Sequence, residues 1–478
     1  MIFSSTLFIF FFLPLVFLSY FLVGSKFRNL LLFVASLVFY AWGEPVYVLV
    51  MLFSIVANYF FGLGIGRVQE QGRRGGWVLC SAVIANIGLL GFFKYADLLR
   101  PYLAPVEWLA PTMQQSHLPL GISFFTFQAI SYVVDVYRKV TPPQRNILNM
   151  GLFIALFPKL MAGPIVRYHD IVEQIAARSI RVEHFATGIE RFIFGLSKKV
   201  LIANPLGNMA DTIFALQMST LSTLTAWLGI ICYTVQLYFD FSGYSDMAIG
   251  LGRMFGFGFL ENFNYPYISR SIQEFWRRWH ISLSNWFRDY LYIPLGGNRF
   301  GALRTCVNLF IVFFFCGMWH GASWNFIVWG LFHGCFLMLE RGAFGRILKT
   351  VPLPLRHLYV LFVVTNAWVF FRLDNLPQIW AYLTALYGFT SSHAIHPVIH
   401  VSMDLSFYIT LIVGVFLAMP VYPSCVRLLS SAGLSPSASK IASPSVSILK
   451  ICLLGVLFLF SSTSLIVGAY NPFIYFRF

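Results

Sequence analysis

The sequence has few charged residues for its length. Asp, Glu, Lys and Arg together make up 11% of the 478 residues, whereas 58% are hydrophobic and the mean hydropathy is +0.74. A water-soluble globular protein carries about 25% charged residues. The low charge therefore excludes a soluble enzyme, and the apolar surplus favours a bundle of lipid-facing helices.

Cysteine and several catalytic motifs are also scarce or absent. The seven cysteines are odd in number and form no C-x-x-C pair, which argues against a disulfide framework or a zinc site. The sequence contains no P-loop, no G-x-S-x-G turn and no H-E-x-x-H helix. These absences disfavour an ATP-driven pump, a covalent serine enzyme and a zinc protease. His393, His396 and His400 have no acidic residue or cysteine among them, so we expect an ordinary loop and no metal site.

Apolar segments of spanning or near-spanning length follow one another along the chain. A transmembrane helix needs about 20 residues, so we predict roughly ten to twelve transmembrane helices, with the shorter segments re-entrant or interfacial. We expect a single integral membrane domain over residues 1–478, and the lack of an internal repeat weakens a transporter built from duplicated halves. The segments lie at about 5–23, 28–42, 46–66, 76–95, 118–137, 147–165, 188–204, 221–240, 305–319, 323–339, 357–371, 405–424 and 449–469.

Basic residues predict the orientation of these segments. They cluster after the first, third and fifth segments, which places the clusters on one side, and the positive-inside rule makes that side cytoplasmic. The net charge of +15 is then explained by cytoplasmic loops, and no nucleic-acid partner is expected. The clusters are Lys26 and Arg28; Arg67, Arg73 and Arg74; and Arg138, Lys139 and Arg145.

The segment 147–165 is unusual because basic residues flank both of its ends. It also contains Pro158, Lys159, Gly163 and Pro164, which interrupt a helix. Irregular backbone at this depth is tolerated only where it is buried in protein or lines a cavity. We therefore predict a re-entrant segment and a bundle with a hollow interior.

The densest polar stretch runs from Asn264 to Arg304. Its pattern predicts one interfacial helix from Pro266 to about Tyr292, with Gln273, Arg277, His280 and Ser284 close to one face. Plain anchoring at the membrane surface is the alternative, because Trp and Arg are common there. If the stretch binds a phosphate-bearing donor, the candidate residues are Arg277, Arg278, Arg288 and Arg299.

The apolar stretch 305–340 predicts a helical hairpin, since Arg304 and Arg341 bracket it. His320 lies near its middle, and an ionisable residue within the membrane is a functional candidate. A neutral imidazole can act as the general base of acyl transfer, whereas a merely structural histidine would bond a neighbouring helix. His333, on the returning limb, either supports His320 or packs, and we expect it to pack. Three acidic residues, Asp135, Asp240 and Asp246, either orient the histidines or line the cavity, or they pair with intramembrane arginine or with backbone.

Long motifs of the chain resemble the membrane-bound O-acyltransferase family, most closely its bacterial alginate O-acetylation branch. The motifs within residues 118–340 are Arg277–Ser284, Phe287–Asn298 and Met318–Ala322, and Met1–Ser5, Phe39–Trp42 and Phe157–Ile165 are also similar. After about Arg372 the chain resembles the family only in being apolar.

The resemblance implies a tunnelled helical bundle in the bacterial inner membrane. It implies His320 as the catalytic position and His280 as a second, supporting one. It further implies acetyl-CoA as the donor, with no bound cofactor. The expected acceptor is an exported polysaccharide, alginate-like or cellulose-like, and the expected partner is a periplasmic acetyltransferase or other accessory protein.

Two alternatives remain open at this point. The same fold would serve D-alanyl transfer to teichoic acid or O-acetylation of peptidoglycan. A different class, a non-catalytic transporter or export scaffold, would use the intramembrane histidine as a proton relay.

Overall fold

The computed structural model of the chain describes most of its length. The described residues are 1–95, 118–161, 163–389, 403–421, 444–468 and 470–472, with Ile399 and Ser424. They form helices and connecting loops, and no strand occurs in this part of the chain. The prediction of an all-α protein is confirmed. His393, His396 and His400 lie outside the described residues.

Long apolar helices confirm a polytopic membrane protein. In the described part, six helices are long and apolar enough to cross a membrane: α3 (Val48–Glu70), α4 (Gly76–Lys94), α13 (Thr223–Met254), α16 (Gly301–His320), α19 (Leu353–Arg372) and, over Ser447–Ile466, α24 (Pro444–Ile466). Three shorter apolar helices add to them: Phe8–Leu22, which joins η1 (Phe8–Phe12) to α1 (Leu13–Leu22), α7 (Ile122–Tyr137) and α22 (Leu405–Leu417). The total of roughly ten to twelve spans stays a prediction.

Shorter helices connect and surround these spans. They are α2 (Arg28–Ala41), α8 (Ile147–Ala155), α9 (Phe157–Leu160), α10 (Tyr168–Ala176), α11 (Val182–Ser197), α12 (Asn204–Phe214), α14 (Ile272–Arg278), α15 (Ile281–Phe287), α17 (Trp324–Arg341), α18 (Ala343–Thr350) and α20 (Leu376–Leu386). Single turns of 3₁₀- or π-helix lie at η2 (Ser25–Phe27), η3 (Lys198–Ala203), η4 (Met218–Thr220), η5 (Pro266–Ile268) and η6 (Arg288–Tyr292).

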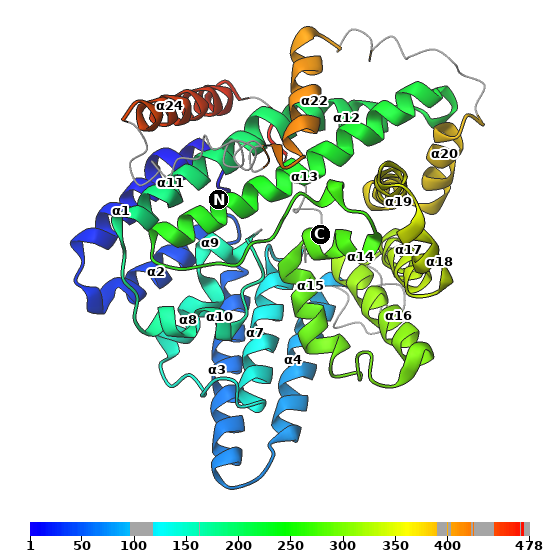
Figure 1. Ribbon diagram of the computed structural model, residues 1–478. Helices are drawn as coiled ribbons and strands as arrows, with labels where there is room; N and C mark the ends of the chain where they lie inside the picture. Colours follow the sequence, from blue (N-terminus) through cyan, green and yellow to red (C-terminus); the bar gives the residue numbers. More distant parts are fainter. Residues whose placement is uncertain are drawn as a thin grey trace, which may run out of the picture.

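Helix α13 crosses the middle of the bundle and packs closely on α11 (Figure 1). Glycines allow this approach: a Cβ added at Gly250 would lie 2.6 Å from the carbonyl oxygen of Gly188. Charges of α13 are paired across the same interface. Asp246 lies 2.8 Å from Arg191 and 2.6 Å from Lys198. The predicted pairing of buried acidic residues with cations is therefore what the structure shows for this residue.

The segment predicted to be re-entrant is broken and buried. Its two helices, α8 and α9, have nine and four residues and are far shorter than a span. Leu156, between them, and Phe157, the first residue of α9, are fully buried, and the Phe157 amide donates to Ser36 Oγ at 3.0 Å. Lys159 is also fully buried and donates to Gln128 of α7. The irregular backbone thus finds its partners inside the protein, as predicted.

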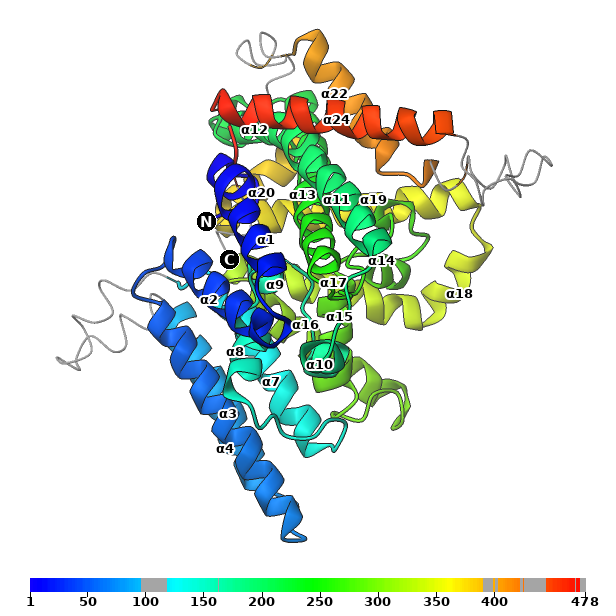
Figure 2. The ribbon, with the colours of Figure 1, turned by 90° about the vertical axis from the view of Figure 1, so that its left-hand side faces the viewer.

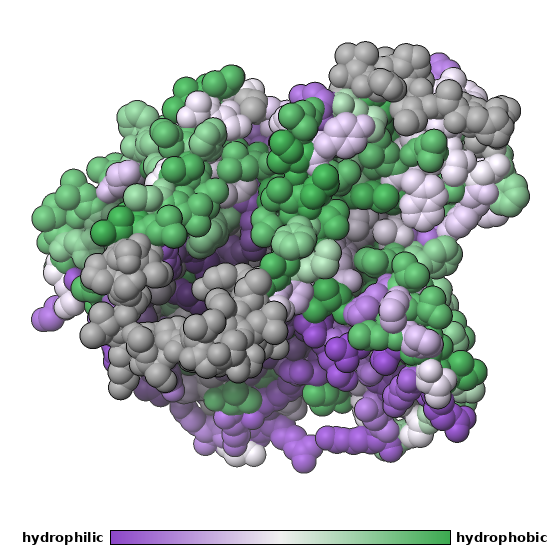
Figure 3. Space-filling model, turned by 45° about the horizontal axis from the view of Figure 1, so that its top comes forward, coloured by the Kyte–Doolittle hydropathy of each residue, from purple (hydrophilic) through white to green (hydrophobic). Residues whose placement is uncertain are grey.

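Contacts between loops define one polar face of the molecule, which we call the basic face. Arg145 pairs with Glu70 at 3.6 Å, Gln69 donates to the carbonyl of Tyr137, and Arg138 donates to that of Asp289. These contacts join the ends of α3 and α7 to η6. Figure 2 shows α3 and α4 extending to one end of the molecule, with α22 and α24 at the opposite end. In Figure 3, hydrophobic residues cover much of the upper surface and hydrophilic residues gather along the lower part.

The prediction of one unbroken helix from Pro266 to about Tyr292 is wrong. The stretch forms η5, α14, α15 and η6, and the chain breaks at Trp279 and His280. His280 has left-handed backbone angles, with φ at 43°. The reason is tertiary: Asn262 accepts the Ile281 amide with its carbonyl at 3.0 Å and the Ser282 amide with its side chain at 3.2 Å. These bonds replace the helical ones, so Arg277, His280 and Ser284 do not share one helical face.

Candidate active site

His320 is the last residue of α16, at the turn of the α16–α17 hairpin. The hairpin itself is confirmed. The His320 side chain is buried, at 3% exposure, among aromatic rings. Its ring centroid lies 4.9 Å from that of Trp319, 4.8 Å from Trp329 and 5.2 Å from Phe371. These rings come from α16, α17 and α19 and hold the imidazole from three sides.

Glycines bring the two limbs of the hairpin together beneath His320. A Cβ at Gly317 would lie 2.4 Å from the carbonyl oxygen of Phe326, and one at Gly330 would lie 2.3 Å from that of Phe313. Small residues at such positions let helix backbones touch in a membrane. A side chain at either position would separate α16 from α17 and displace the His320 ring.

His280 reaches the same aromatic group from the other side. Its Nδ1 lies 3.2 Å from Oδ1 of Asn262, and no hydrogen-bond partner of its Nε2 is found among the described residues. Its ring lies 6.2 Å from that of Trp319, so Trp319 contacts both imidazoles. The break at His280 thus brings the second predicted histidine toward the first, which a continuous helix would not do.

His333 packs in a second aromatic cage, which shares Trp329 with the cage around His320. Its ring stacks on Phe275 at 6.1 Å and meets Trp276 at 5.2 Å and Trp329 at 5.1 Å. Neither ring nitrogen has a hydrogen-bond partner among the described residues. These contacts agree with the predicted packing role, and Trp329 contacts both His333 and His320.

A cavity of about 150 Å³ lies between α14, α15, η6 and α16, and His320 is not among its lining residues. Arg288 and Tyr292 of η6 line one part of it, and Cys316 of α16 lines another. Cys316 precedes His320 by four residues, which is one helical turn on the same face. The other lining residues are Trp276, Leu283, Ser284, Phe287, Leu309, Val312 and Phe313. A tunnel through the protein stays a prediction.

The four predicted donor-binding arginines lie in different surroundings. Arg288 lines the cavity and also pairs with Asp289 at 2.7 Å. Arg278 pairs with Glu274 at 2.9 Å and donates to the Asn264 carbonyl, so it holds local structure. Arg277 and Arg299 are exposed and do not line this cavity. The structure therefore brings one of the four to the candidate site.

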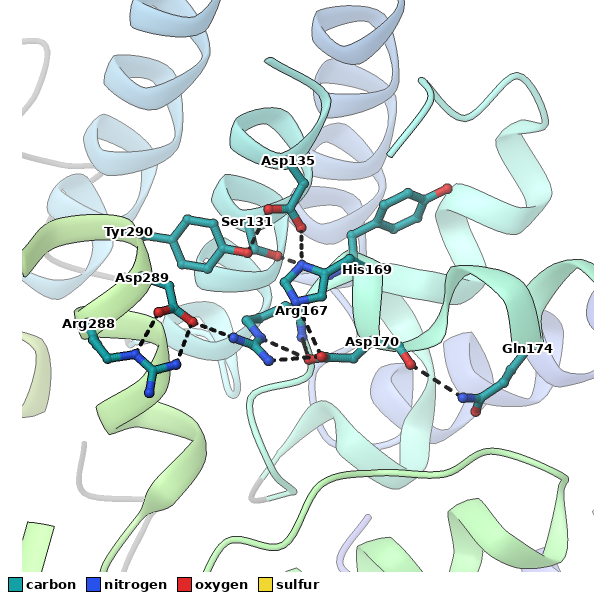
Figure 4. A network of polar contacts seen from close by, with 10 residues as sticks. Ser131, Asp135, Arg167, His169, Asp170, Gln174, Arg288, Asp289 and Tyr290 are labelled. Atoms are coloured by element: carbon teal, nitrogen blue, oxygen red, sulfur yellow. Dashed lines mark hydrogen bonds and ion pairs between the residues drawn. The ribbon is translucent and has the colours of Figure 1, made fainter. Parts of the chain in front are cut away.

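Figure 4 shows a polar network that includes Arg288, one of the residues that line the cavity. Arg167 pairs with Asp289 at 2.6 Å and with Asp170 at 2.9 Å. Asp135 accepts a hydrogen bond from Tyr290 at 2.8 Å and lies 2.8 Å from Nδ1 of His169. The network ties α7 and α10 to η6, next to Arg288. Sequence reasoning missed Arg167 and His169, because neither belongs to an apolar segment or to the arginine-rich stretch.

The network makes stability depend on pH in a defined direction. The hydrogen bond with Asp135 holds the pKa of His169 above its ordinary value of about 6.5. The folded protein therefore binds this proton more tightly than the unfolded chain. That stabilisation is complete when the pH is below the ordinary pKa of histidine, and it is lost as the pH rises through the raised pKa of His169. We expect His169→Gln to lower the melting temperature most at about pH 5.5 and least at about pH 8.5.

Melting of the purified protein in detergent across this pH range tests the prediction. His184→Gln is the matched control, since His184 is exposed on α11. A difference between wild type and His169→Gln that stays constant with pH would contradict a proton held by Asp135.

Lys94 is a second residue that sequence reasoning missed. It ends α4, is 8% exposed and donates to the carbonyl oxygen of Trp319. One feature of the sequence points to it. With the predicted orientation, Lys94 lies at the outer end of its span, where the positive-inside rule disfavours lysine.

Comparison with known proteins places this arrangement in a family. Residues 113–376 match the model of the membrane-bound O-acyltransferase family. A probable alginate O-acetylase of Pseudomonas aeruginosa is 47% identical over 393 residues, which cover 81% of this chain and 75% of that protein. The peptidoglycan O-acetyltransferase of Helicobacter pylori is 36% identical over 528 residues, covering 100% of this chain and 98% of that protein. The teichoic acid D-alanyltransferase of Bacillus subtilis is 30% identical over 289 residues, covering 57% and 71%.

The family match covers more than half of the chain and includes α14 to α17, the elements that carry His280 and His320. The relatives extend the similarity over most of its length. The chain is a membrane enzyme that transfers acyl groups, and it belongs to the membrane-bound O-acyltransferase family.

Proposed function

We propose that this chain is an O-acetyltransferase that takes acetyl groups from cytoplasmic acetyl-CoA and passes them across the inner membrane. The acetyl groups modify an exported polysaccharide, alginate-like or cellulose-like, with the help of a periplasmic acetyltransferase or other accessory proteins. The observation that carries the proposal is the cavity between Arg288, at the basic face, and Cys316, one helical turn from His320. A donor that enters at Arg288 is led toward the imidazole.

In the proposed reaction His320 acts as a general base. The hydroxyl oxygen of the acceptor attacks the thioester carbonyl carbon while the imidazole takes the hydroxyl proton. The carbon–sulfur bond then breaks, the acetyl group stays on the acceptor oxygen, and the imidazolium returns the proton to the thiolate. Trp319, Trp329 and Phe371 exclude water from the imidazole and so protect the thioester from hydrolysis. His280 supports this arrangement from the opposite side of Trp319.

The dimensions of the cavity favour a short acyl group. Its volume is about 150 Å³, and Trp276, Phe313 and Cys316 are among the residues that line it. Arg288 offers a guanidinium at the entrance, which suits the phosphates of a coenzyme A thioester. The identity with alginate O-acetylases supports an exported polysaccharide as the acceptor.

Peptidoglycan is a second candidate acceptor. The alignment with the Helicobacter pylori peptidoglycan O-acetyltransferase runs the length of both proteins, whereas that with the Pseudomonas aeruginosa alginate O-acetylase covers 81% of this chain. D-alanyl transfer is less well supported, because the Bacillus subtilis teichoic acid enzyme matches 57% of the chain. The export-scaffold alternative is disfavoured by membership in an enzyme family.

A labelled-donor assay tests the proposal. Purified protein in lipid nanodiscs is incubated with radiolabelled acetyl-CoA or with a D-alanylated carrier protein, and with alginate oligosaccharides, cellulose oligosaccharides or peptidoglycan fragments. We expect the acetyl label, and not the alanyl label, to be consumed. Consumption of the D-alanyl carrier alone would contradict the proposed donor, and label on peptidoglycan fragments alone would favour the second acceptor.

The position of Arg288 leads to a prediction about donor binding. Arg288→Gln removes a cation from the cavity entrance, so the KM for acetyl-CoA should rise roughly tenfold, the effect of losing one hydrogen bond to a charged group. Arg299→Gln is the matched control, because Arg299 is exposed and does not line the cavity. Initial rates at varied acetyl-CoA concentration give both KM values. Equal KM values for the two variants would remove Arg288 from the donor site.

A further inference from the structure

The last turn of α16 accepts hydrogen bonds from side chains at the end of another helix, α4. The final carbonyls of an α-helix have no partner within the helix and need donors from elsewhere. Here two successive carbonyls next to His320 receive donors from the end of α4. Tyr95 Oη donates to the Met318 carbonyl at 2.6 Å, and Lys94 Nζ donates to the Trp319 carbonyl. The residues that meet are 223 and 225 positions apart in the chain.

Lys94 also contacts the side chain of Trp319 and a neighbouring helix. Its Nζ lies 5.7 Å from the centroid of the Trp319 ring and 3.3 Å from Ser123 Oγ of α7. The Trp319 indole nitrogen donates to the Ser123 carbonyl at 3.5 Å. The backbone carbonyl, the ring face and the indole nitrogen of Trp319 are therefore each held by α4 or α7. Trp319 is the residue whose ring contacts both His280 and His320.

The burial of Lys94 argues for a role inside the protein. A lysine at the end of a span normally extends its ammonium to the membrane surface. Lys94 is only 8% exposed and instead turns toward the end of α16. Anchoring at the interface does not require the Lys94 ammonium to point toward α16, whereas a hydrogen bond to the end of α16 does.

We propose that Lys94 and Tyr95 form a clamp that positions His320 for acyl transfer. The inference rests on the proposed function, in which His320 is the general base. Both residues act through the Met318 and Trp319 carbonyls and so are positioning residues. By fixing the final turn of α16 and the Trp319 ring, the clamp sets the direction of the imidazole relative to the acyl carbon.

The kinetic effect of Lys94→Met tests the clamp. Methionine fills a similar volume but has no donor for the Trp319 carbonyl. A misplacement of about 1 Å in an active site costs about 10²-fold in rate, so we expect kcat to fall roughly 10- to 100-fold. The KM for acetyl-CoA should change little, because Lys94 does not line the donor cavity. Lys94→Arg keeps donors at this position and should restore most of kcat.

Ser81→Ala is the matched control. Ser81 is exposed on the same helix, α4, and its hydroxyl donates to the Trp77 carbonyl at 3.0 Å, so kcat should stay near the wild-type value. If Lys94→Met fails to fold, Tyr95→Phe decides the question, since it removes one carbonyl bond and buries no unpaired charge. A lower kcat at unchanged melting temperature then supports the clamp, and an unchanged kcat overturns it.

The outcome for His320→Ala in the same assay separates the clamp from the function. An inactive His320→Ala beside a fully active Lys94→Met overturns the clamp and leaves the proposed function standing. A fully active His320→Ala removes the proposed function itself, and the clamp with it.

Discussion

Replacing His320 with alanine is expected to lower the rate of acetyl transfer by about 10²–10⁴-fold, the usual contribution of a general base. Two structural features of His320 suit the role of a general base. It is buried at 3% exposure in an aromatic cage, and it lies one helical turn from Cys316, which lines the cavity. Initial rates with labelled acetyl-CoA in nanodiscs measure the effect.

The control for this variant must separate lost chemistry from lost folding. His184→Ala replaces an exposed histidine of α11 and should keep wild-type activity. Membrane abundance and melting temperature of His320→Ala should stay close to those of wild type. If His320→Ala retained the wild-type rate, the imidazole would have no part in the reaction.

Replacing Lys199 with methionine is expected to produce the largest loss of stability. Lys199 of η3 pairs with Asp240 of α13 at 2.8 Å, and both side chains are only 1% exposed. Removing one partner of a buried ion pair leaves the other charge uncompensated and costs about 3–5 kcal/mol. Lys199 also donates to the Pro472 carbonyl, so the variant loosens the C-terminal segment as well. The free energy of unfolding in detergent micelles measures the loss.

Two further variants identify the cause of this loss. Lys450→Met breaks an ion pair with Glu190 that is partly exposed, and it should cost less than about 1 kcal/mol. The double variant Lys199→Met with Asp240→Asn removes both charges and should recover part of the stability. The losses of stability are also measured for Lys199→Met and Asp240→Asn separately. If the double variant loses as much stability as these two variants together, the two side chains do not act as a pair.

The regular part of the fold could be predicted from the sequence because it depends on local pattern. Apolar runs of spanning length predict α3, α4 and α16, and the interruptions at Pro158 and Gly163 predict the broken segment. The α16–α17 hairpin follows from Arg304 and Arg341 at its two ends. In each case the residues that predict the element lie within it or at its ends, because the tendency of a segment to enter lipid depends on its own composition.

The site depends on contacts that no local pattern contains. The chain breaks at His280 because Asn262, 18 residues earlier, binds its ring and the amide of Ser282. Lys94 reaches Trp319 across 225 residues. Of the four candidate arginines, Arg288 lines the cavity whereas Arg278 pairs with Glu274. Sequence reasoning identified the chemical groups, and tertiary contacts decided which of them meet.

The break at His280 also has an energetic consequence. Left-handed backbone angles in a residue other than glycine cost about 1–3 kcal/mol and persist only where surrounding contacts impose them. Asn262 supplies those contacts with its carbonyl and its side chain. Strain of this kind is concentrated at functional sites. The strain at His280 therefore favours a role for this residue beside His320, and this role stays a prediction.

The most direct test uses right-side-out membrane vesicles from cells that produce the chain, loaded with labelled acetyl-CoA. The account predicts label on polysaccharide outside the vesicles with the wild-type chain and none with His320→Ala. It also predicts that acetyl-CoA supplied only outside is not used, because the proposed entry of the donor is at Arg288, which lines the cavity near the basic face. Equal labelling with the His320→Ala chain, or labelling from external acetyl-CoA alone, would contradict a transfer through this imidazole from the inner to the outer side.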